Sequence, residues 1–318
     1  GLRKELSLIQ TYLAFTYYCQ SRYGRAIQCF EKGWEIAKSI EDPTFLKFAR
    51  TFHTFSFFCK GDLIKAIQSY EESMPVIENL SDDYYQTVLG CAVGLCYGLT
   101  GLFSQGLGLV DAVRKACLKK DHVVPNYVLM NMAFLMIYLH RPDDAFSFLN
   151  HVIDDGDSEQ FLRTRYLAAF AHYLKGEKKE AFKILKYCLE RRQIFNIGVS
   201  THGLWFELCK AMEEGEFPRI DGIRLADEID FYIEEENILI KGIAYRYKAY
   251  IQEREAQSSE TIIETLSLSA KWLEEAGAIF EQCRTLQALI HQQILKGDHA
   301  SAEETKGKIR TILGSFSH

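Results

Sequence analysis

Five side chains that can bind a metal lie close together in the segment NHVIDDGDSEQ, residues 150–160. They are His151, Asp154, Asp155, Asp157 and Glu159. His151 and Asp155 are four residues apart, so one turn of helix would bring an imidazole and a carboxylate onto the same face. The segment lacks the ligand spacing of an EF-hand loop. We therefore favour an exposed acidic turn between two structural units over a metal site, and we predict no bound metal.

The glycine-rich stretch GLCYGLTGLFSQGLG, residues 94–108, is the second segment that has the composition of a binding loop. Phosphate-binding loops follow the patterns GxxxxGK[ST] or GxGxxG between a strand and a helix, and neither pattern occurs in this sequence. Gly94, Gly98 and Gly101 instead fit positions of close helix contact and of a turn. A packing role is therefore favoured over a phosphate cradle.

No arrangement of residues in the sequence indicates catalysis. The nine histidines are dispersed, and no HExxH zinc motif occurs. His53 and His172 fall at helix-contact positions, where we expect a buried, hydrogen-bonded histidine. We predict that the chain is not an enzyme and has no cofactor. An enzyme of unrecognised class stays open as a third possibility, because catalytic groups can converge from distant parts of a chain.

The composition is that of a folded protein: 318 residues, 47% hydrophobic and 25% charged, with a net charge of −6. Lysines and arginines are scattered and form no basic stripe, so direct nucleic-acid binding is not expected. No run of 18 apolar residues and no signal peptide occurs, so no membrane span is expected. The nine cysteines are widely spaced, with no CxxC pair, which favours a reducing cytoplasm.

Three similar phrases recur far apart: KGDLIKAIQSYEESM from Lys60, KGEKKEAFKILKYCLE from Lys175 and KGDHASAEETKGKIRTI from Lys296. In each, an alanine follows the glycine by five residues, and weaker versions of this offset follow Ser21 and His140. Residues with this offset, together with positions one further period along the chain, define anchors about 40 residues apart. Such a regular spacing is the signature of a repeat architecture. The anchors are Ala26, Ala66, Gly106, Ala145, Ala181, Gly222, Ile262 and Ala302.

Each repeat has the pattern of two helices joined by a tight turn. The anchor and the positions four and seven residues later form one helical stripe. A small residue lies twelve residues before the anchor and a large one lies nine residues before it, as in Ala14 and Tyr17. This combination suits close contact between two helices. Asp62 and Asp143 stand where they can cap the second helix, and Pro75 should kink or end the helix that Asp62 begins. One pair cannot bury its stripe alone, so neighbouring pairs must stack.

The sequence therefore predicts an all-α, right-handed superhelical solenoid of about eight helix-turn-helix units. We expect five clear units in residues 1–198 and three degenerate units in residues 199–318 that continue the same solenoid. Each helix pair resembles the tetratricopeptide repeat (TPR) in the order of its residue types: a small residue, a large residue, the turn, an alanine, an aromatic residue and a second small residue. It is carried by Ala14, Tyr17, Ala26, Phe30 and Gly33, and then by Thr54, Phe57, Ala66, Tyr70 and Ser73.

The period near 40 residues is longer than the 34 residues of the usual TPR. Long-period versions look like the repeat domains of bacterial signalling ATPases and of transcriptional activators of the maltose-regulator type. The segment AKWLEEAGAIFEQCRTLQALIHQQILKGDHASAEE especially resembles the last repeats of such domains. The resemblance implies a sensor or autoinhibitory platform beside an ATPase or DNA-binding module, and hence a piece of a larger multidomain protein.

In this repeat family the first helix of each pair lines the inner groove, so the resemblance also indicates where a partner would bind. The groove positions lie fifteen, eleven and eight residues before each anchor, and many carry aromatic side chains, which give large contact areas at little entropic cost. The candidate concave-face residues are Thr11, Phe15, Tyr18, Phe55, Phe58, Met130, Phe134, Tyr166, Phe170 and Tyr173. Packing of these side chains against the next pair is the alternative interpretation.

The predicted function is that of a protein-interaction or sensor domain in a bacterial signalling or transcription-regulating protein. Its partner would be a protein or peptide segment, or a neighbouring domain of the same polypeptide. The alternative is a receptor domain for a peptide or small molecule. A closed apolar cavity would favour the receptor, whereas an open groove with a polar rim would favour the partner-binding scaffold.

Overall fold

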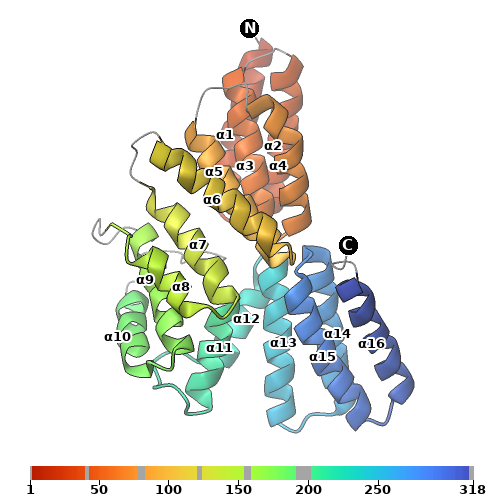
Figure 1. Ribbon diagram of the computed structural model, residues 1–318. Helices are drawn as coiled ribbons and strands as arrows, with labels where there is room; N and C mark the ends of the chain where they lie inside the picture. Colours follow the sequence, from red (N-terminus) through yellow and green to blue (C-terminus); the bar gives the residue numbers. More distant parts are fainter. Residues whose placement is uncertain are drawn as a thin grey trace.

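The computed structural model describes residues 2–39, 43–77, 83–119, 124–153, 159–190 and 202–314. Within these ranges the chain forms sixteen α-helices and no β-strand (Figure 1), which confirms the predicted all-α solenoid. In chain order the helices are α1 (Leu2–Cys19), α2 (Tyr23–Ser39), α3 (Pro43–Lys60), α4 (Leu63–Ile77), α5 (Asp83–Leu99), α6 (Phe103–Lys119), α7 (Asn126–Tyr138), α8 (Pro142–Leu149), α9 (Glu159–Leu174), α10 (Lys178–Leu189), α11 (His202–Glu213), α12 (Leu225–Glu234), α13 (Ile238–Arg254), α14 (Ser259–Ala276), α15 (Ile279–Leu295) and α16 (His299–Gly314).

The recurring phrase is the turn that ends the first helix of a pair. In the α3–α4 turn, the N–H of Gly61 donates to the Phe58 carbonyl and the N–H of Asp62 donates to the Phe57 carbonyl, at 2.9 and 3.0 Å. This is a Schellman motif, which requires a left-handed residue just after the helix. The left-handed residues five positions before an anchor are Ser21, Gly61, Gly101, His140, Gly176 and Gly297, with φ between 56° and 93°.

The anchors mark the closest approach of the two helices in a pair. Ala26, Ala66 and Ala145 are completely buried. At Gly106 in α6, an added Cβ would lie 2.5 Å from the carbonyl oxygen of Gly94 in α5, so the two backbones touch. The small residues at these positions are therefore required by packing, because any larger side chain would force the helices apart.

The sixth repeat departs from the expected arrangement. Gly222, the expected sixth anchor, lies in a turn before α12 with a φ of 80° and not within a helix. The reason is that a longer connection, residues 214–224, separates α11 from α12. Ile229, seven residues beyond Gly222, is buried in α12, and the seventh anchor Ile262 is buried in α14. The buried stripe of the second helix is thus preserved where the turn is not.

One of the two expected helix caps forms. Asp62 accepts a hydrogen bond from the backbone N–H of Lys65 at 3.3 Å and so caps α4. Asp143 does not cap α8, because it lies within the first turn of that helix; its carboxylate instead pairs with Lys175 Nζ at 2.9 Å. Pro75 lies inside α4, which ends two residues later at Ile77.

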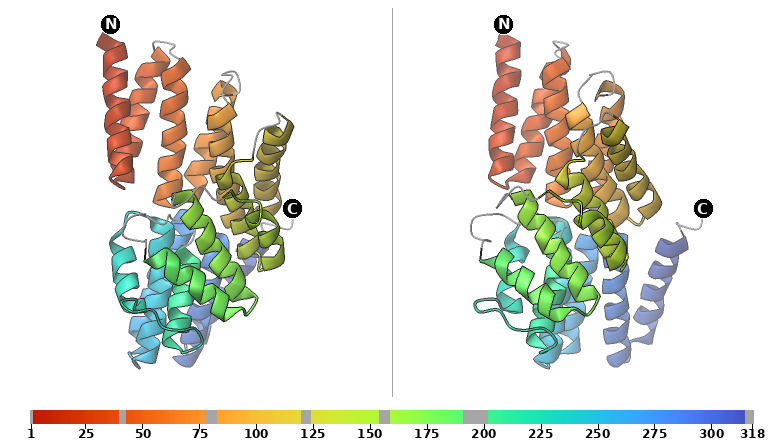
Figure 2. Two further views of the ribbon diagram at one scale, coloured as in Figure 1. Left: turned by 90° about the vertical axis from the view of Figure 1, so that its left-hand side faces the viewer. Right: turned by 60° about the vertical axis from the view of Figure 1, so that its left-hand side comes forward.

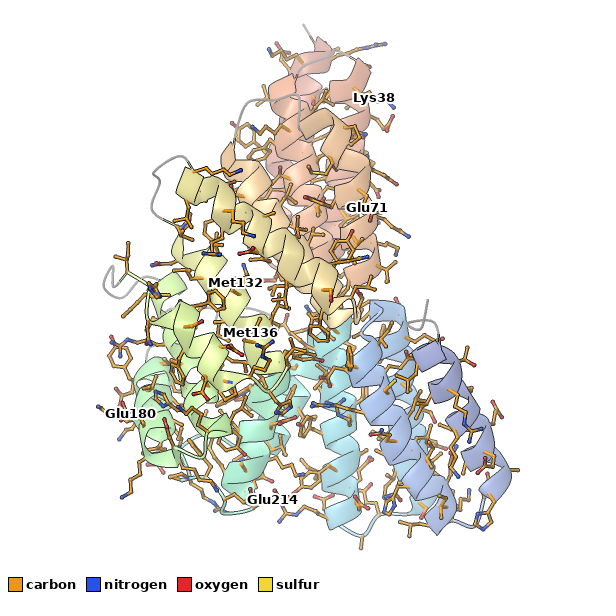
Figure 3. The ribbon with its side chains drawn as sticks, in the orientation of Figure 1. Lys38, Glu71, Met132, Met136, Glu180 and Glu214 are labelled. Carbon is orange, nitrogen blue, oxygen red and sulfur yellow. The ribbon has the colours of Figure 1, made fainter. Side chains whose placement is uncertain are left out.

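The largest apolar core runs through most of the pairs, from Ile27 of α2 to Ala278 just before α15. Trp205 and Phe206 of α11 are among its largest fully buried side chains. Figure 3 shows Met132 and Met136 of α7 in the interior. None of the described helices is both long and apolar enough to cross a membrane, and none of the nine cysteines, all of which are described, forms a disulfide. The labelled side chains on the outer surface are Lys38, Glu71, Glu180 and Glu214.

The chain curls until its C-terminal helices meet the turns of its N-terminal pairs (Figures 1 and 2), and we call helices α1–α6 the N-terminal arm and α11–α16 the C-terminal arm. Asn237, which caps α13, donates from Nδ2 to the Cys59 carbonyl oxygen at 2.6 Å. An added Cβ on Gly61 would lie 2.5 Å from Asn237 Oδ1, and one on Gly277, between α14 and α15, would lie against the Ile64 side chain. The two arms therefore touch turn against turn.

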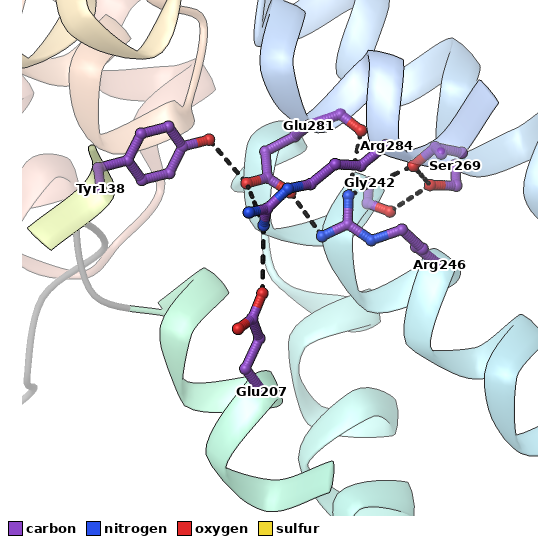
Figure 4. A network of polar contacts seen from close by, with 8 residues as sticks. Tyr138, Glu207, Gly242, Arg246, Ser269, Glu281 and Arg284 are labelled. Atoms are coloured by element: carbon purple, nitrogen blue, oxygen red, sulfur yellow. Dashed lines mark hydrogen bonds and ion pairs between the residues drawn. The ribbon is translucent and has the colours of Figure 1, made fainter. Parts of the chain in front are cut away.

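A buried ion-pair network lies beside these contacts and joins four helices (Figure 4). Glu281 in the first turn of α15 is 3% exposed. Its carboxylate accepts hydrogen bonds from Tyr138 Oη of α7, at 2.6 Å, and from Arg246 of α13. Arg284 Nη1 lies 3.6 Å from Glu281 Oε1 and 3.1 Å from Glu207 Oε1 of α11. Desolvated charges are tolerated only when such partners are in place, so the network fixes these helices relative to one another.

His53 is a buried core histidine, as expected from its position, and one of its two ring nitrogens is hydrogen-bonded. Its Nδ1 atom lies 3.0 Å from the Ser69 hydroxyl. Burial lowers the pKa of His53 to about 4, and the positive charge of Arg50 contributes to the same shift. His53 is therefore neutral at pH 7 in the folded chain. His172 is half-buried, and its Nδ1 atom lies 2.5 Å from a Glu177 carboxylate oxygen.

The network predicts that Glu281→Ala destabilises the fold by about 3–5 kcal/mol, because it leaves the buried Arg246 guanidinium without its main partner. Urea unfolding at pH 7 measures this loss. The matched control is Glu260→Ala, which removes an exposed carboxylate 3.0 Å from Lys296 Nζ and should cost no more than about 1 kcal/mol. Equal effects of the two substitutions would show that the buried network does not hold these four helices together.

The buried His53 should make the free energy of unfolding decrease as the pH falls. A histidine in the unfolded chain titrates near pH 6.5, whereas in the folded chain the pKa of His53 is about 4. The unfolded state thus binds the proton first as the pH falls, and stability drops from about pH 6.5 to pH 4 by roughly 2–3 kcal/mol.

The difference in unfolding free energy between wild type and His53→Gln, measured across this range, isolates the histidine. Its contribution should vanish in the variant, while the exposed His291→Gln should keep the wild-type profile. A profile of His53→Gln parallel to that of wild type would contradict the assignment.

Candidate functional site: the inner aromatic face

The ten candidate residues come from four first helices, α1, α3, α7 and α9, and none of them is fully exposed. Thr11 is buried, and its hydroxyl donates to the Ser7 carbonyl at 2.8 Å. Three aromatic side chains are also buried, with exposed fractions of 1–4%: Phe134, Tyr166 and Phe170. The half-buried candidates are Phe15, Tyr18, Phe55, Phe58, Met130 and Tyr173.

Half-buried aromatic rings of α1 and α3 form a continuous row. The ring centres of Phe15 and Tyr18 lie 5.0 and 5.7 Å from that of Phe52, which lies 6.4 Å from Phe55. Phe48 and Phe52 are not among the candidates, although their spacing of four and then three residues to Phe55 puts all three on one helical face. The inner aromatic row consists of Phe15, Tyr18, Phe48, Phe52, Phe55 and Phe58.

The aromatic candidates of α9 pack against neighbouring elements in this structure. Tyr166 lies 6.0 Å from the ring of Trp205 in α11, and Tyr173 lies 5.7 Å from Phe217 in the connection after α11. Tyr166 also meets Phe170 edge-on at 5.0 Å. These rings fill the space between the fifth pair and the C-terminal arm, so they are less accessible to a partner than the rings of the inner aromatic row.

The inner aromatic row ends at a small apolar cavity between the two arms. The cavity has a volume of about 30 Å³, enough for one or two water molecules. Phe58 and Leu63 contribute to its wall from the N-terminal arm. The other lining residues come from α5, α7, α11, α13 and α15, and include Leu99, Phe134, Tyr138, Leu204, Leu239 and Glu281.

The polar group in the cavity wall is an ionised and fully partnered carboxylate. Burial alone would raise the pKa of Glu281, but the Arg246 and Arg284 guanidiniums and the hydrogen bonds from Tyr138 and Arg246 outweigh it, so the pKa of Glu281 lies below its usual value. Burial, and then the negative charge of Glu281, raises the pKa of Tyr138. At neutral pH the wall therefore presents a carboxylate whose charge is already balanced.

Two thiols of the N-terminal arm, Cys59 and Cys91, are not activated nucleophiles. Cys59 Sγ lies 3.7 Å from Tyr18 Oη, and burial raises the pKa of Cys59 to about 11. Burial likewise raises the pKa of Cys91 to about 12. Both thiols are protonated at pH 7, and a protonated thiol is a poor nucleophile.

The described part of the chain contains no group of three or more His, Cys, Asp or Glu residues placed to hold a metal ion. The candidate ligands Asp154, Asp155 and Asp157 lie outside the described residues. His151 is exposed, and its Nδ1 atom lies 2.8 Å from the Ser147 carbonyl oxygen.

No protein-family model matches the sequence, and no curated protein matches it either. The structure is similar to that of a Rap protein complexed with competence and sporulation factor, with a TM-score of 0.62 at 12% sequence identity over 98% of this chain and 99% of that one. It also matches TPR-like repeats of a putative kinesin light chain from Podospora anserina, with a TM-score of 0.47 at 15% identity over 61% of this chain and 98% of that one. The likeness to the Rap protein extends over the whole chain and shows that this protein has a TPR-like, all-α repeat fold.

Proposed function

We propose that this chain is a regulatory repeat domain that binds a protein or peptide segment through the inner aromatic row and has no catalytic activity of its own. The observation that carries the proposal is the row itself. Six aromatic rings contact one another in series from α1 to α3, mostly edge-on or tilted, and all six are only half-buried. Rigid aromatic side chains of this kind act as anchors in protein interfaces, because they add contact area at little cost in side-chain entropy.

Two further points support this function. The Rap protein with the same fold was solved with a factor bound, so the fold is compatible with a binding role. The raised pKa values of the buried thiols Cys59 and Cys91 give no indication of thiol chemistry. We extend the proposal to a cytoplasmic setting in a bacterial signalling or transcription-regulating protein of the maltose-regulator type, in which a neighbouring domain of the polypeptide is an equally suitable partner.

The remaining candidate residues form a second layer of the proposed binding face, behind the inner aromatic row or further along the chain. Phe134 lines the cavity behind the row, and Met130, Tyr166, Phe170 and Tyr173 lie further along the same series of first helices. A partner reaches the buried members of this set only when α7 and α9 move away from the C-terminal arm. The row on α1 and α3 is therefore the part of the site that a partner contacts first.

A receptor for a peptide or small molecule is the second candidate function, and the cavity between the arms favours it. Phe58 and Leu63 of the N-terminal arm face Leu204 and Leu239 of the C-terminal arm across this space. A ligand that enlarged the cavity would change the separation of the arms. Such a receptor would convert ligand binding into a shape change that a neighbouring domain could sense.

Binding at the row is tested by selecting peptides from a display library on the immobilised chain and measuring their dissociation constants by fluorescence anisotropy. Phe55→Ala should weaken the selected peptides at least about tenfold, as expected for an aromatic anchor. Phe231→Ala, which removes an exposed ring of α12, is the matched control and should leave binding unchanged. The proposal would be contradicted if the selected peptides bound Phe55→Ala as tightly as they bind the wild-type chain.

The same peptides distinguish the two candidate functions. Gly203→Ala places a methyl group in the cavity wall, 3.3 Å from Ile243 Cδ1, without touching the row. Loss of binding in Gly203→Ala with retention in Phe55→Ala would favour the receptor. The opposite pattern would favour the inner aromatic row. Unfolding midpoints of all variants establish that each remains folded.

A further inference from the structure

Helix α1 has one face buried against the rest of the chain and a second, apolar face that is exposed. Ser7, Thr11 and Ala14 face the rest of the chain and are buried. The other face carries side chains that are 39–82% exposed. This outer stripe consists of Leu2, Leu6, Ile9 and Leu13. A single exposed aliphatic side chain is ordinary, whereas four on one helical face mark an interaction surface.

The two ends of the solenoid differ in this respect. Figure 2 shows α1 at the outer edge of the helical array, and α16 is the last of the described helices. The outward side of α16 carries charged residues such as Glu303, Glu304 and Lys308. A polar outer face of this kind is what keeps the end of a repeat array soluble. The outward side of α1 lacks such a face, and its exposed apolar stripe is available to a partner.

The spacing of the outer stripe is self-complementary. Its residues are separated by four, three and four positions, so the stripe reads the same from either end. Two antiparallel copies of α1 then place Leu2 against Leu13 of the second copy, and Leu6 against Ile9 of the second copy. We propose that a second copy of this chain docks on α1 through this stripe, antiparallel and about a two-fold axis.

The charges on α1 are compatible with this arrangement. No charged residue lies within the stripe. A two-fold axis of this kind brings each flank of the helix against the same flank of its copy. Glu5 then lies beside Tyr12 of the second copy, whose hydroxyl can donate to the carboxylate. Tyr12 is 63% exposed and therefore available for this contact.

The area is sufficient for a reversible dimer. Each exposed aliphatic or aromatic side chain of α1 can remove on the order of 100 Å² from water. The stripe and Tyr12 together would then bury roughly 500 Å² per copy, about 1,000 Å² in the pair, at the lower limit for a specific interface. The inner aromatic row is left free, because Phe15 and Tyr18 lie on a different side of α1 and pack towards α3.

Sedimentation equilibrium of the purified chain tests the dimer, and wild type should show a reversible monomer–dimer equilibrium. Leu6→Glu and Ile9→Lys, each alone, should raise the dimer dissociation constant at least about 30-fold, because every dimer would bury the unpaired charge twice. The antiparallel register predicts rescue when the two variants are mixed. The mixture should form a heterodimer within about tenfold of wild-type affinity, since the carboxylate introduced in one copy would face the ammonium group introduced in the other.

The control is Leu313→Glu, which adds a charge at an exposed leucine of α16 and should leave the equilibrium unchanged. Circular dichroism and unfolding midpoints establish that all variants are folded. A monomer at every concentration, or a dimer insensitive to both α1 substitutions, overturns the proposal. Failure of the mixture to reassociate overturns the antiparallel pairing, and a monomer that floats with anionic phospholipid vesicles would identify the stripe as a membrane-binding face instead.

Discussion

The carboxylate of Glu281 is the charge around which α7 and the C-terminal arm are assembled. It is almost completely removed from water, and its hydrogen bonds come from α7 and α13. A buried carboxylate without partners is strongly unfavourable, so Tyr138 and Arg246 must be in position whenever α7 lies against the C-terminal arm. Arg284 extends the constraint to α11 through Glu207. The relative position of these helices, and with it the cavity between the arms, follows from satisfying this one group.

The proposed binding face depends on the closure of the two arms against each other. Phe58 belongs both to the inner aromatic row and to the cavity wall, so the row ends where the arms meet. The turn contacts of Gly61 with Asn237 and of Gly277 with Ile64 add close packing at the same boundary. Separation of the two arms would therefore break tight turn contacts, and movement of the C-terminal arm away from α7 would also break desolvated ionic contacts. This arrangement favours two discrete states over a gradual opening, and gives a repeat domain a means to report binding to its neighbours.

The periodic parts of the fold were accessible from the sequence, because each depends on local chemistry. A left-handed residue must follow the first helix of a pair, and Gly61, Gly101 and Gly176 supply it cheaply. Small anchors such as Ala66 must follow five residues later, because two backbones meet there. The anchor of the sixth unit was predicted wrongly from this spacing, since the connection before α12 is longer and Gly222 forms part of the turn. Phe48 and Phe52 were missed because the family pattern marks other positions of the first helix as groove residues.

The sequence by itself determined the helices, their pairing and their buried stripes, because hydrophobic periodicity and turn chemistry act between residues close in the chain. Only the tertiary structure decided which aromatic candidates are accessible: Phe15 and Phe55 remain half-buried, whereas Phe134 and Phe170 are covered by neighbouring helices. It alone also joined Tyr138 to Glu281, which are 143 residues apart. Contacts between distant helices depend on the accumulated curvature of the whole superhelix, to which every pair contributes, and no local pattern encodes that sum.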